Sequence, residues 1–205
     1  MWQRLPDTGG LKSMNKIEDA FKNKKAFIPF VTAGDPSLDV TRELILAMQE
    51  AGADLIEIGI PFSDPVAEGP VIQEADDRAL SAGVTTDKIF DMVDDIADKI
   101  HVPIVFMTYI NPIYVYGVEK FAKRAKACGA AGVIVPDVPF EEKEEIRGSF
   151  EAEGLVVISM VAPTSADRVR MIAKEAKGFL YCVSSLGVTG VRTEIGTAIG
   201  DLIQT

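Results

Sequence analysis

The sequence predicts an α/β fold, a TIM-type (β/α)8 barrel of which this chain holds about six of the eight β/α units. Short apolar runs alternate with amphipathic segments at a spacing of roughly 25 to 30 residues, typical of parallel strands joined by crossover helices. Polar residues stand at the end of each run, where a barrel places its functional groups. The first run is followed by Thr-Ala-Gly-Asp-Pro, which lacks the glycine-rich phosphate turn of a doubly wound sheet.

The apolar runs predict six strands, and the segments between them predict helices. The helix expected first has apolar residues at helical spacing and ends at Gly52, as helices commonly do. The expected strands are residues 26–32, 55–60, 103–107, 132–135, 156–161 and 178–183. The expected helices are residues 40–51, 73–80, 86–100, 118–128, 141–153 and 166–177. A last apolar stretch lies near residues 195–203.

Nothing in the series marks a domain boundary, so residues 14–205 are predicted to form one domain. Residues 1–13 lack the apolar core of a signal peptide and are expected to be an extra or disordered segment. A complete barrel has eight strands and about 250 residues. We therefore expect a fragment that lacks strands seven and eight.

Composition restricts the classes of partner and chemistry. Acidic residues outnumber basic ones 31 to 21, for a net charge of −10, which disfavours nucleic acid and membrane surfaces as partners. No run reaches the ~18 apolar residues that a membrane span needs. Cys128 and Cys182 are far apart, and the single histidine, His101, excludes a Ser-His-Asp triad or a histidine-rich metal site. We expect no metal and a cytoplasmic location.

Glu57 is a carboxylate inside an apolar strand. Side chains alternate along a strand, so Leu55, Glu57 and Gly59 share one face and isoleucines occupy the other. The isoleucines suit the helix-facing layer, which points Glu57 into the barrel. Burial there raises the pKa of a carboxyl and makes it a useful general acid. An ion pair inside the barrel is an equally open interpretation of this pattern.

A set of short motifs, in order and with matching spacing, resembles the tryptophan synthase α subunits from about Met14 to the end of the chain. The motifs are PFVTAGDP, EIGIPFSDP, AEGPVIQEA, TYINP, VPDVP, VAPTS and LYCVSSLGVTGVR. The resemblance implies a lyase that cleaves indole-3-glycerol phosphate to indole and D-glyceraldehyde 3-phosphate by a retro-aldol reaction, in L-tryptophan biosynthesis. It implies no cofactor in this subunit. Glu57 matches the general acid, which protonates C3 of the indole ring and helps to remove the side-chain hydroxyl proton.

Glu68 matches the second carboxylate of the family, which faces the indole N–H and stabilises its positive charge. Taken alone, an acid before Gly69 and Pro70 at a helix start more often complements the helix dipole. The family commonly has DPLADGP where this chain has DPVAEGP, so glutamate replaces aspartate. The charge is kept and the reach grows by about one bond, and a misplacement of ~1 Å can cost ~100-fold in rate. Either the pocket compensates or activity is reduced.

The resemblance also implies roles for other side chains, each with an ordinary structural alternative in packing, turns or caps. Tyr181 lies near the reacting side chain of the substrate, and Thr189 closes a loop over the second carboxylate. Asp137 contacts that closed loop, with a cap for the following helix as its alternative. The remaining substrate-binding residues are Phe30, Thr32, Tyr109 and, for the phosphate, Gly190.

Pro61, Asp64 and Asn111 match the surface on which the family docks its β subunit. That partner carries pyridoxal phosphate and receives indole through a tunnel. The resemblance therefore implies an α2β2 tetramer with this chain in the α role. As isolated residues, Pro61 and Asp64 indicate only turn chemistry.

Two rival interpretations stay open. The first is an inactive, truncated α-type barrel that at most binds the β subunit, because the family's main phosphate loops follow strands seven and eight. It predicts negligible activity from this chain as it stands. The second is another phosphate-binding barrel enzyme, such as a sugar-phosphate epimerase or an indole-glycerol-phosphate synthase. A single histidine disfavours the metal-assisted epimerases, and no strand-end lysine stands out as the acid that the synthase needs.

Overall fold

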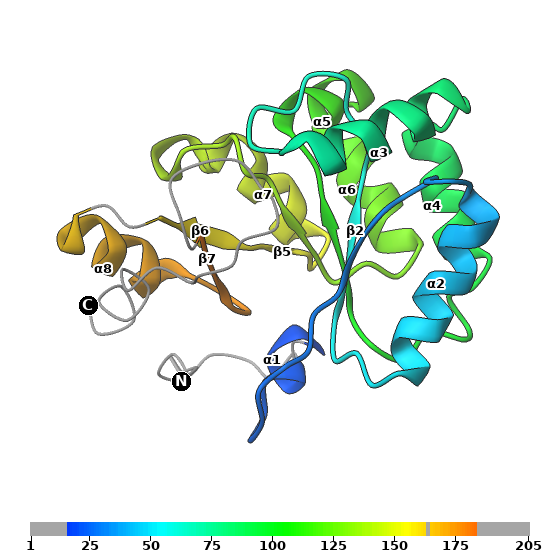
Figure 1. Cartoon of the computed structure of the whole chain (residues 1–205). Helices are drawn as coiled ribbons and strands as arrows, with labels where there is room; N and C mark the ends of the chain where they lie inside the picture. Colours follow the sequence, from blue (N-terminus) through cyan, green and yellow to red (C-terminus); the bar gives the residue numbers. More distant parts are fainter. Residues whose placement is uncertain (1–15, 163–164, 184–205) are drawn as a thin grey trace.

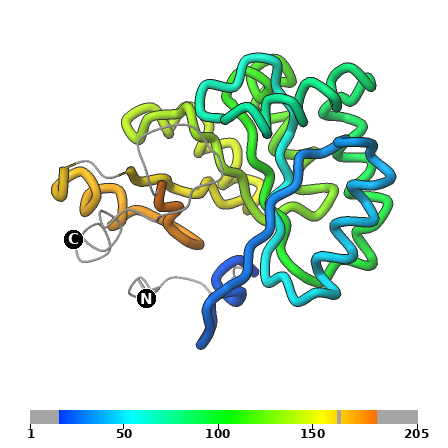
Figure 2. Tube along the Cα trace, viewed as in Figure 1, coloured from blue at the N-terminus to red at the C-terminus, as the bar shows by residue number. Residues whose placement is uncertain are grey.

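The computed structural model describes residues 16–162 and 165–183 of the chain. Its strands form a parallel arc with helices on the outside, and the chain runs once along this arc (Figures 1 and 2). A five-stranded sheet has the order β1-β2-β3-β4-β5, and β6 pairs with β7 in a separate two-stranded sheet. The strands are β1 Phe30–Thr32, β2 Ile56–Gly59, β3 Ile104–Met107, β4 Gly132–Ile134, β5 Val156–Val157, β6 Ser159–Val161 and β7 Leu180–Cys182.

All six predicted strands are confirmed, and one of them is divided. The run 156–161 forms β5 and β6 on either side of Ile158, whose N–H still donates to the carbonyl of Val133 at 2.9 Å. β5 pairs with β4 and β6 pairs with β7, and every pair is parallel. The chain therefore changes its pairing partner within a single extended segment.

The predicted helices are also present, with two additions. The long helix expected at 86–100 ends at Asp94, and the one expected at 141–153 begins with the short 3-10 helix η1. The two helices not predicted are α1, which is five residues long, and α5, which carries Pro112 in its first turn, where proline is tolerated. The helices are α1 Lys16–Ala20, α2 Leu38–Glu50, α3 Pro70–Ser81, α4 Thr86–Asp94, α5 Ile110–Tyr116, α6 Val118–Ala127, η1 Phe140–Glu142, α7 Glu144–Ala152 and α8 Ala166–Glu175.

The strands separate two apolar layers. Ile56, Ile58 and Ile60 belong to the outer cluster, which packs against the helices and contains the fully buried rings of Phe90 and Phe121. The inner cluster is formed by the alternate residues of the strands and by α1: Ile17, Ala20, Leu55, Val105, Ile134, Val156, Ile158 and Phe179. The inner face of β2 is therefore the one that carries Leu55 and Glu57.

Helix α1 closes the inner layer at the amino ends of the strands (Figure 1). Its Ile17 is fully buried. A Cβ atom on Gly132 or Gly178 would lie 3.2 or 3.1 Å from this side chain. Glycine is required at Gly132, where a Cβ would also lie 2.5 Å from the backbone oxygen of Val156, and it is favoured at Gly178 by a φ of +72°. The opposite end of the strands is left for the polar groups.

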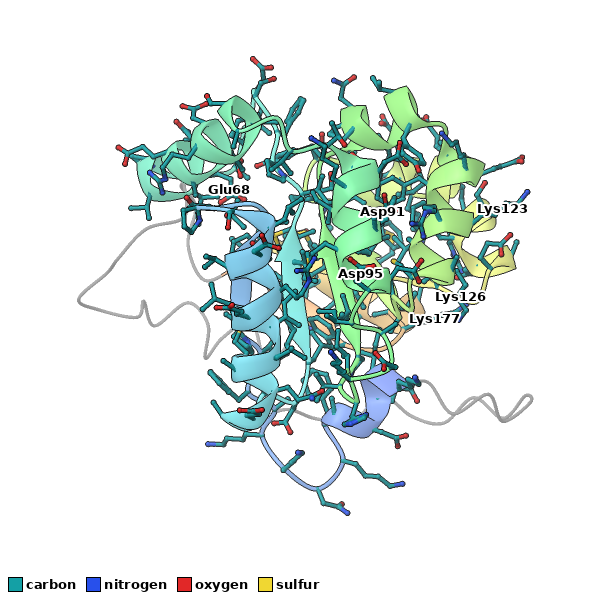
Figure 3. The ribbon with its side chains drawn as sticks, turned by 90° about the vertical axis from the view of Figure 1, so that its right-hand side faces the viewer. Glu68, Asp91, Asp95, Lys123, Lys126 and Lys177 are labelled. Atoms are coloured by element: carbon teal, nitrogen blue, oxygen red, sulfur yellow. The ribbon has the colours of Figure 1, made fainter. Side chains whose placement is uncertain are left out.

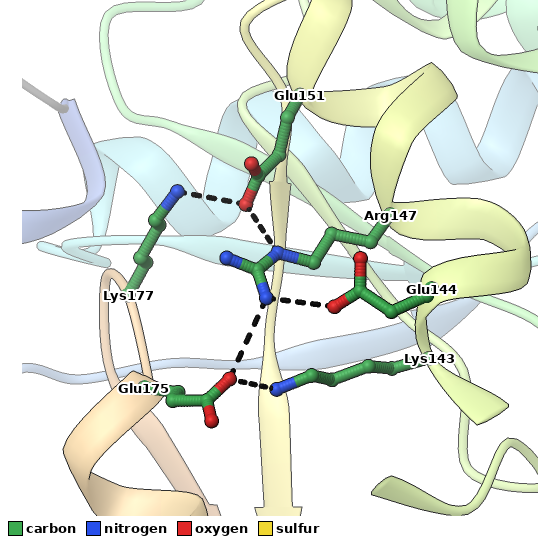
Figure 4. A network of polar contacts seen from close by, with 6 residues as sticks. All are labelled: Lys143, Glu144, Arg147, Glu151, Glu175 and Lys177. Carbon is green, nitrogen blue, oxygen red and sulfur yellow. Dashed lines mark hydrogen bonds and ion pairs between the residues drawn. The ribbon is translucent and has the colours of Figure 1, made fainter. Parts of the chain in front are cut away.

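A network of ion pairs connects α7 with the end of α8 (Figure 4). Arg147 contacts Glu144 and Glu151 at 2.9 Å and Glu175 at 3.5 Å. Lys177 reaches Glu151 at 2.7 Å, and Lys143 pairs with Glu175. The network lines a cavity of about 270 Å³, whose apolar walls include Val157, Val161 and Ile172. The α8 unit is thus joined to α7 by charged side chains at the rim of this cavity.

Candidate active site

Glu57 lies in the middle of β2 on its inner face. Its Cα is in register with Phe30 on β1 and Val105 on β3, and its backbone N–H donates to the carbonyl of Pro29 at 2.9 Å. The residue is only 6% exposed, and burial raises the pKa of its carboxyl to about 7. A carboxyl with this pKa is available as a proton donor near neutral pH.

Tyr181 on β7 lies close enough to Glu57 and Glu68 for their negative charges to act on its hydroxyl. Burial raises the pKa of the Tyr181 hydroxyl, and the negative charges of Glu57 and Glu68 raise it further. The three residues assigned to catalysis from the sequence therefore gather in one electrostatic environment, although they come from a strand, a loop and a distant strand.

Glu68 lies directly before the first turn of α3, at the end of the molecule where that helix begins (Figure 3). Its side chain is half-buried, and its backbone carbonyl accepts a hydrogen bond from Gln73 Nε2 at 2.8 Å. Glu68 directly precedes Gly69, the N-cap residue of α3. The positive end of the helix dipole therefore lies beside this acid. Figure 3 also labels charged residues that lie away from Glu68: Asp91 on α4, Asp95 just after it, and Lys123 and Lys126 on α6.

Tyr109 is buried between the Glu68 loop and α5. Its hydroxyl accepts a hydrogen bond from the backbone N–H of Ala67 at 3.0 Å, and its ring lies 5.5 Å from the ring of Phe62. Burial raises the pKa of this hydroxyl to about 12. The pocket-lining role suggested by the sequence stays a prediction; the structure shows that Tyr109 holds the backbone of the residue next to Glu68.

Phe30 and Thr32 lie on β1, on the same face as Glu57. Val31 between them belongs to the outer cluster, whereas Phe30 is in register with Glu57 and Thr32 with Gly59. A Cβ atom on Gly59 would lie 2.5 Å from Cζ of Phe30. The missing side chain at Gly59 therefore makes room for an aromatic ring beside Glu57.

Asp137 accepts hydrogen bonds from the backbone N–H of Ile110 at 3.0 and 3.2 Å, one to each carboxylate oxygen. It caps α5, the helix before it in the chain, and not the following helix that the sequence suggested. The loop residues Thr189 and Gly190 lie outside the described residues.

The three positions assigned to a partner surface differ in their exposure. Asp64 and Asn111 are exposed, on the Glu68 loop and in the first turn of α5. Pro61 is buried in this chain. Only the first two therefore present surface to a partner in the structure as it stands.

Asp76 is a buried acid that the sequence did not single out. It lies on α3 between the buried residues Ala75 and Ala79, and only 6% of it is exposed. The charge of Glu68 contributes to its raised pKa, which places it beside the site. The available signal was a carboxylate on the apolar stripe of an amphipathic helix.

Within the described residues, no group of three or more histidine, cysteine, aspartate or glutamate side chains is placed to hold a metal ion. No helix in the same part of the chain is long and apolar enough to cross a membrane. The carboxyl groups of Glu57 and Glu68 can transfer a proton and stabilise a positive charge.

Comparison with known proteins identifies the family of the chain. The family model described as tryptophan synthase alpha chain matches residues 17–205. A tryptophan synthase alpha chain from Halalkalibacterium halodurans is 48% identical over 194 residues, which cover 94% of this chain and 73% of the relative. One from Petrotoga mobilis is 50% identical over 178 residues, covering 86% and 69%.

Solved structures give the same result. Mycobacterium tuberculosis tryptophan synthase matches with a TM-score of 0.82 and 32% identity, over 92% of this chain and 74% of that one. The tryptophan synthase α2β2 complex of Pyrococcus furiosus matches with a TM-score of 0.80 and 41% identity, over 87% and 72%. The predicted fold class is confirmed by these superpositions, and the chain belongs to the tryptophan synthase alpha chain family.

Proposed function

We propose that this chain carries the lyase reaction of the tryptophan synthase α subunit, the retro-aldol cleavage of indole-3-glycerol phosphate to indole and D-glyceraldehyde 3-phosphate. The observation that carries the proposal is Glu57, a buried acid on the inner face of β2 whose pKa of about 7 leaves about half of it protonated at neutral pH. Membership of the family supports the same role in tryptophan biosynthesis.

The reaction needs a proton on the ring and a stabilised positive charge. Glu57 gives its proton to C3 of the indole ring, and the ring nitrogen becomes cationic. The Glu68 carboxylate faces that nitrogen and stabilises its charge. The side-chain hydroxyl then loses its proton to Glu57, the carbon–carbon bond breaks, and its electron pair returns to the ring. Indole leaves, and the former alcohol carbon becomes the aldehyde of the second product.

The remaining site residues hold the substrate. In this proposal Phe30 and Tyr181 flank the reacting part of the substrate, which is supported by the register of Phe30 with Glu57 and by the charges of Glu57 and Glu68 acting on Tyr181. Thr32 lies on the same inner face, and Asp137 supports the site by holding the first turn of α5. Thr189 and Gly190 are proposed, from the resemblance alone, to close the site and hold phosphate.

We further propose a β subunit as partner, in an α2β2 tetramer, with pyridoxal phosphate bound to that partner and not to this chain. The solved Pyrococcus furiosus relative is an α2β2 complex, which supports the assembly. Asp64 is exposed on the Glu68 loop, and Asn111 is exposed in α5, whose N-cap residue Tyr109 contacts that loop, which supports a partner that receives indole there. A cytoplasmic location remains a prediction from the sequence.

The test is release of indole from indole-3-glycerol phosphate in the presence of a β subunit. It compares the wild type with Glu57→Gln and with Glu50→Gln, the same change on the exposed end of α2. Each protein is assayed as the 205-residue chain and as a fusion to the C-terminal part of the Halalkalibacterium halodurans relative, of which this chain covers 73%.

The proposal is supported if the 205-residue chain or the fusion turns over substrate, and if this turnover is lost in Glu57→Gln but kept in Glu50→Gln. Binding of the β subunit without turnover in both forms contradicts it and favours the non-catalytic rival. Turnover that survives Glu57→Gln contradicts the role of Glu57.

A further inference from the structure

The loop of residues 60–69 carries Glu68 near its end, and two side chains hold the backbone on either side of this acid. The backbone N–H of Ala67 donates to the Tyr109 hydroxyl at 3.0 Å. The backbone carbonyl of Glu68 accepts a hydrogen bond from Gln73 Nε2 at 2.8 Å. Both distances are those of ordinary protein hydrogen bonds. The segment formed by Ala67 and Glu68 is therefore held at both of its ends.

Tyr109 is itself fixed in place, so it can anchor the loop. It is 5% exposed and is the N-cap residue of α5. Ile110, the next residue, donates its backbone N–H to the two carboxylate oxygens of Asp137 at 3.0 and 3.2 Å. The Tyr109 ring also packs on the ring of Phe62, near the start of the loop, with 5.5 Å between the ring centroids. Tyr109 thus contacts the loop near its start through the ring and near its end through the hydroxyl.

Gln73 holds the loop from the helix that follows it. Helix α3 begins at Pro70, and its N-cap residue Gly69 has no side chain that could cap the first turn. Long side chains on a helix point back toward its N-terminus. The amide of Gln73 therefore reaches the carbonyl of Glu68, five positions earlier in the chain. The position of Glu68 is tied in this way to the start of α3.

The carboxylate of Glu68 has no such support of its own. Within residues 16–162 and 165–183, it makes no hydrogen bond and no ion pair, and the backbone carbonyl is the atom of Glu68 that is bonded. The direction in which the carboxylate points is therefore set by its backbone and its rotamer. Fixing the backbone matters more for a glutamate than for an aspartate, because the longer side chain has one more rotatable bond.

We propose that the Tyr109 hydroxyl and the Gln73 amide are positioning groups for the lyase reaction: together they hold the backbone that aims the Glu68 carboxylate at the ring nitrogen of the substrate. The inference rests on the proposed function, whereas the two hydrogen bonds do not. In this role both groups act through Glu68 and not on the reacting atoms. The pocket-lining role predicted for Tyr109 concerns its ring, and Tyr109→Phe separates the two roles because it removes the hydroxyl and keeps the ring.

Amide hydrogen exchange in the 205-residue chain tests the contact of Tyr109 directly. Exchange of the Ala67 amide is measured for the wild type, Tyr109→Phe and Tyr116→Phe. Tyr116 is the matched control, because it ends α5 and its hydroxyl bonds Asp87 on the exposed surface. We expect Tyr109→Phe to speed exchange of Ala67 by about two- to tenfold, the effect of losing one hydrogen bond between neutral groups, and Tyr116→Phe to leave it unchanged. Unchanged exchange of Ala67 in Tyr109→Phe overturns the proposal.

The contact of Gln73 is followed at the Gly69 amide, which belongs to the same peptide group as the Glu68 carbonyl. Its NMR order parameter is measured for the wild type, Gln73→Ala and Glu74→Ala. Glu74 is the control, because it is the next residue of α3 and is exposed. Release of the carbonyl in Gln73→Ala should lower the order parameter, and Glu74→Ala should keep the wild-type value. An order parameter that is the same in Gln73→Ala and the wild type contradicts the role of Gln73.

Lyase kinetics in the complex with the β subunit test the consequence for the reaction. Tyr109→Phe and Gln73→Ala should each lower kcat by about two- to tenfold and change KM less, because the charge that Glu68 stabilises develops only during the reaction. In the Glu68→Ala background neither change should lower kcat further, since both act through the carboxylate that is already lost. Tyr116→Phe and Glu74→Ala should leave kcat unchanged in both backgrounds.

The double variants separate positioning from a general structural effect. A loss of kcat that is equal with and without the Glu68 carboxylate shows that Tyr109 and Gln73 act independently of Glu68, and it overturns the proposal. No turnover by the wild type, together with faster exchange of Ala67 in Tyr109→Phe, contradicts the lyase assignment and leaves the hold of Tyr109 on the loop supported.

Discussion

Phe30 and Glu57 face each other across the first two strands: their Cα atoms are in register, and the Phe30 ring occupies the space above Gly59, the next inward position of β2. The apolar ring and the acid are thus neighbours on the inner face of the sheet. Glu57 has no ion-pair partner within residues 16–162 and 165–183, and burial is the cause of its raised pKa, which this pairing with an apolar ring explains. The apolar surroundings, and not an interaction with another charge, keep the proton on Glu57.

Replacing Glu57 by glutamine is expected to stabilise the protein at alkaline pH. Because the folded-state pKa is raised to about 7 from an ordinary value of 4.5, the folded chain holds this proton where the unfolded chain releases it. The associated stability is present below pH 4.5 and is lost as the pH rises through 7. The difference in free energy of unfolding between Glu57→Gln and the wild type should therefore shift in favour of the variant by on the order of 3 kcal/mol from pH 4 to pH 8. Urea unfolding at pH 4 and pH 8 measures this difference, with Glu50→Gln as the control. A difference between Glu57→Gln and the wild type that is the same at both pH values contradicts the prediction.

Changes at Glu68 test whether glutamate, one methylene longer than the aspartate common in the family, still stabilises the positive charge on the indole nitrogen. Glu68→Asp is expected to keep activity within about tenfold of the wild type, because the charge remains and the reach changes by one bond. Glu68→Ala is expected to lower kcat by about 100-fold or more, because the cationic ring nitrogen loses its counter-charge. The comparison uses the lyase assay with the β subunit. Wild-type activity in the alanine variant removes Glu68 from the mechanism.

A side chain at Gly59 should disturb Phe30. The Cβ atom of Gly59→Ala would lie 2.5 Å from Cζ and 2.9 Å from Cε2 of the ring, so the ring must move away from Glu57. We expect weaker binding of indole-3-propanol phosphate, an uncleavable analogue, and a stability cost of roughly 1–3 kcal/mol. Gly148→Ala is the control: it lies exposed in α7 with no atom within 4 Å of its Cβ, and should stabilise by up to ~1 kcal/mol. Unchanged analogue binding by Gly59→Ala shows that Phe30 does not line the substrate pocket.

The ion pairs between α7 and α8 should make a small, salt-dependent contribution to stability (Figure 4). Burial raises the pKa of Glu151, but hydrogen bonds from Lys177 and Arg147 outweigh this and leave it lowered. Its contribution is therefore present above the ordinary pKa of a glutamate and is lost as the pH falls through the lowered value. Glu151→Gln should cost roughly 0.5–1 kcal/mol at pH 7, and little in 1 M salt. The cost should shrink as the pH falls through the lowered pKa of Glu151.

Thermal unfolding of Glu151→Gln is compared with that of Glu153→Gln. The described residues show no ion pair for Glu153, so its replacement should change stability little. An equal loss in the two variants, or a loss that persists in 1 M salt, contradicts a role for the network.

The strands and the inward direction of Glu57 could be predicted because both depend on local periodicity. Continuous apolar runs are required where both faces of a sheet are covered, and the alternation around Glu57 separates the two layers. The division of the fifth strand at Ile158 could not be predicted, since it depends on which neighbour each half pairs with. Helix α5 was missed because Pro112 reads as a helix breaker unless it is known to lie in the first turn.

For the site, too, what depends on local sequence could be predicted, and what depends on contacts between distant residues could not. The identity of the candidate acids came from motifs, but the contact of Tyr109 with Ala67 joins residues 42 positions apart. Asp76 was overlooked although its place among the buried residues of α3 was a signal in the sequence, a carboxylate on an apolar stripe. The role of Asp137 at the substrate loop stays a prediction; its structural alternative, a cap for the following helix, was wrong, because a cap that reaches backward in the chain looks the same in sequence as one that reaches forward.

The central claim, that Glu57 keeps its proton near neutral pH inside the barrel, is tested most directly by carbon NMR. The side-chain carboxyl signal of Glu57, assigned by its loss in Glu57→Gln, is followed between pH 3 and pH 9 in the 205-residue chain. A midpoint near pH 7 is the predicted result. A midpoint near 4.5, the ordinary value for a glutamate, would show a solvated carboxylate and contradict its role as the general acid.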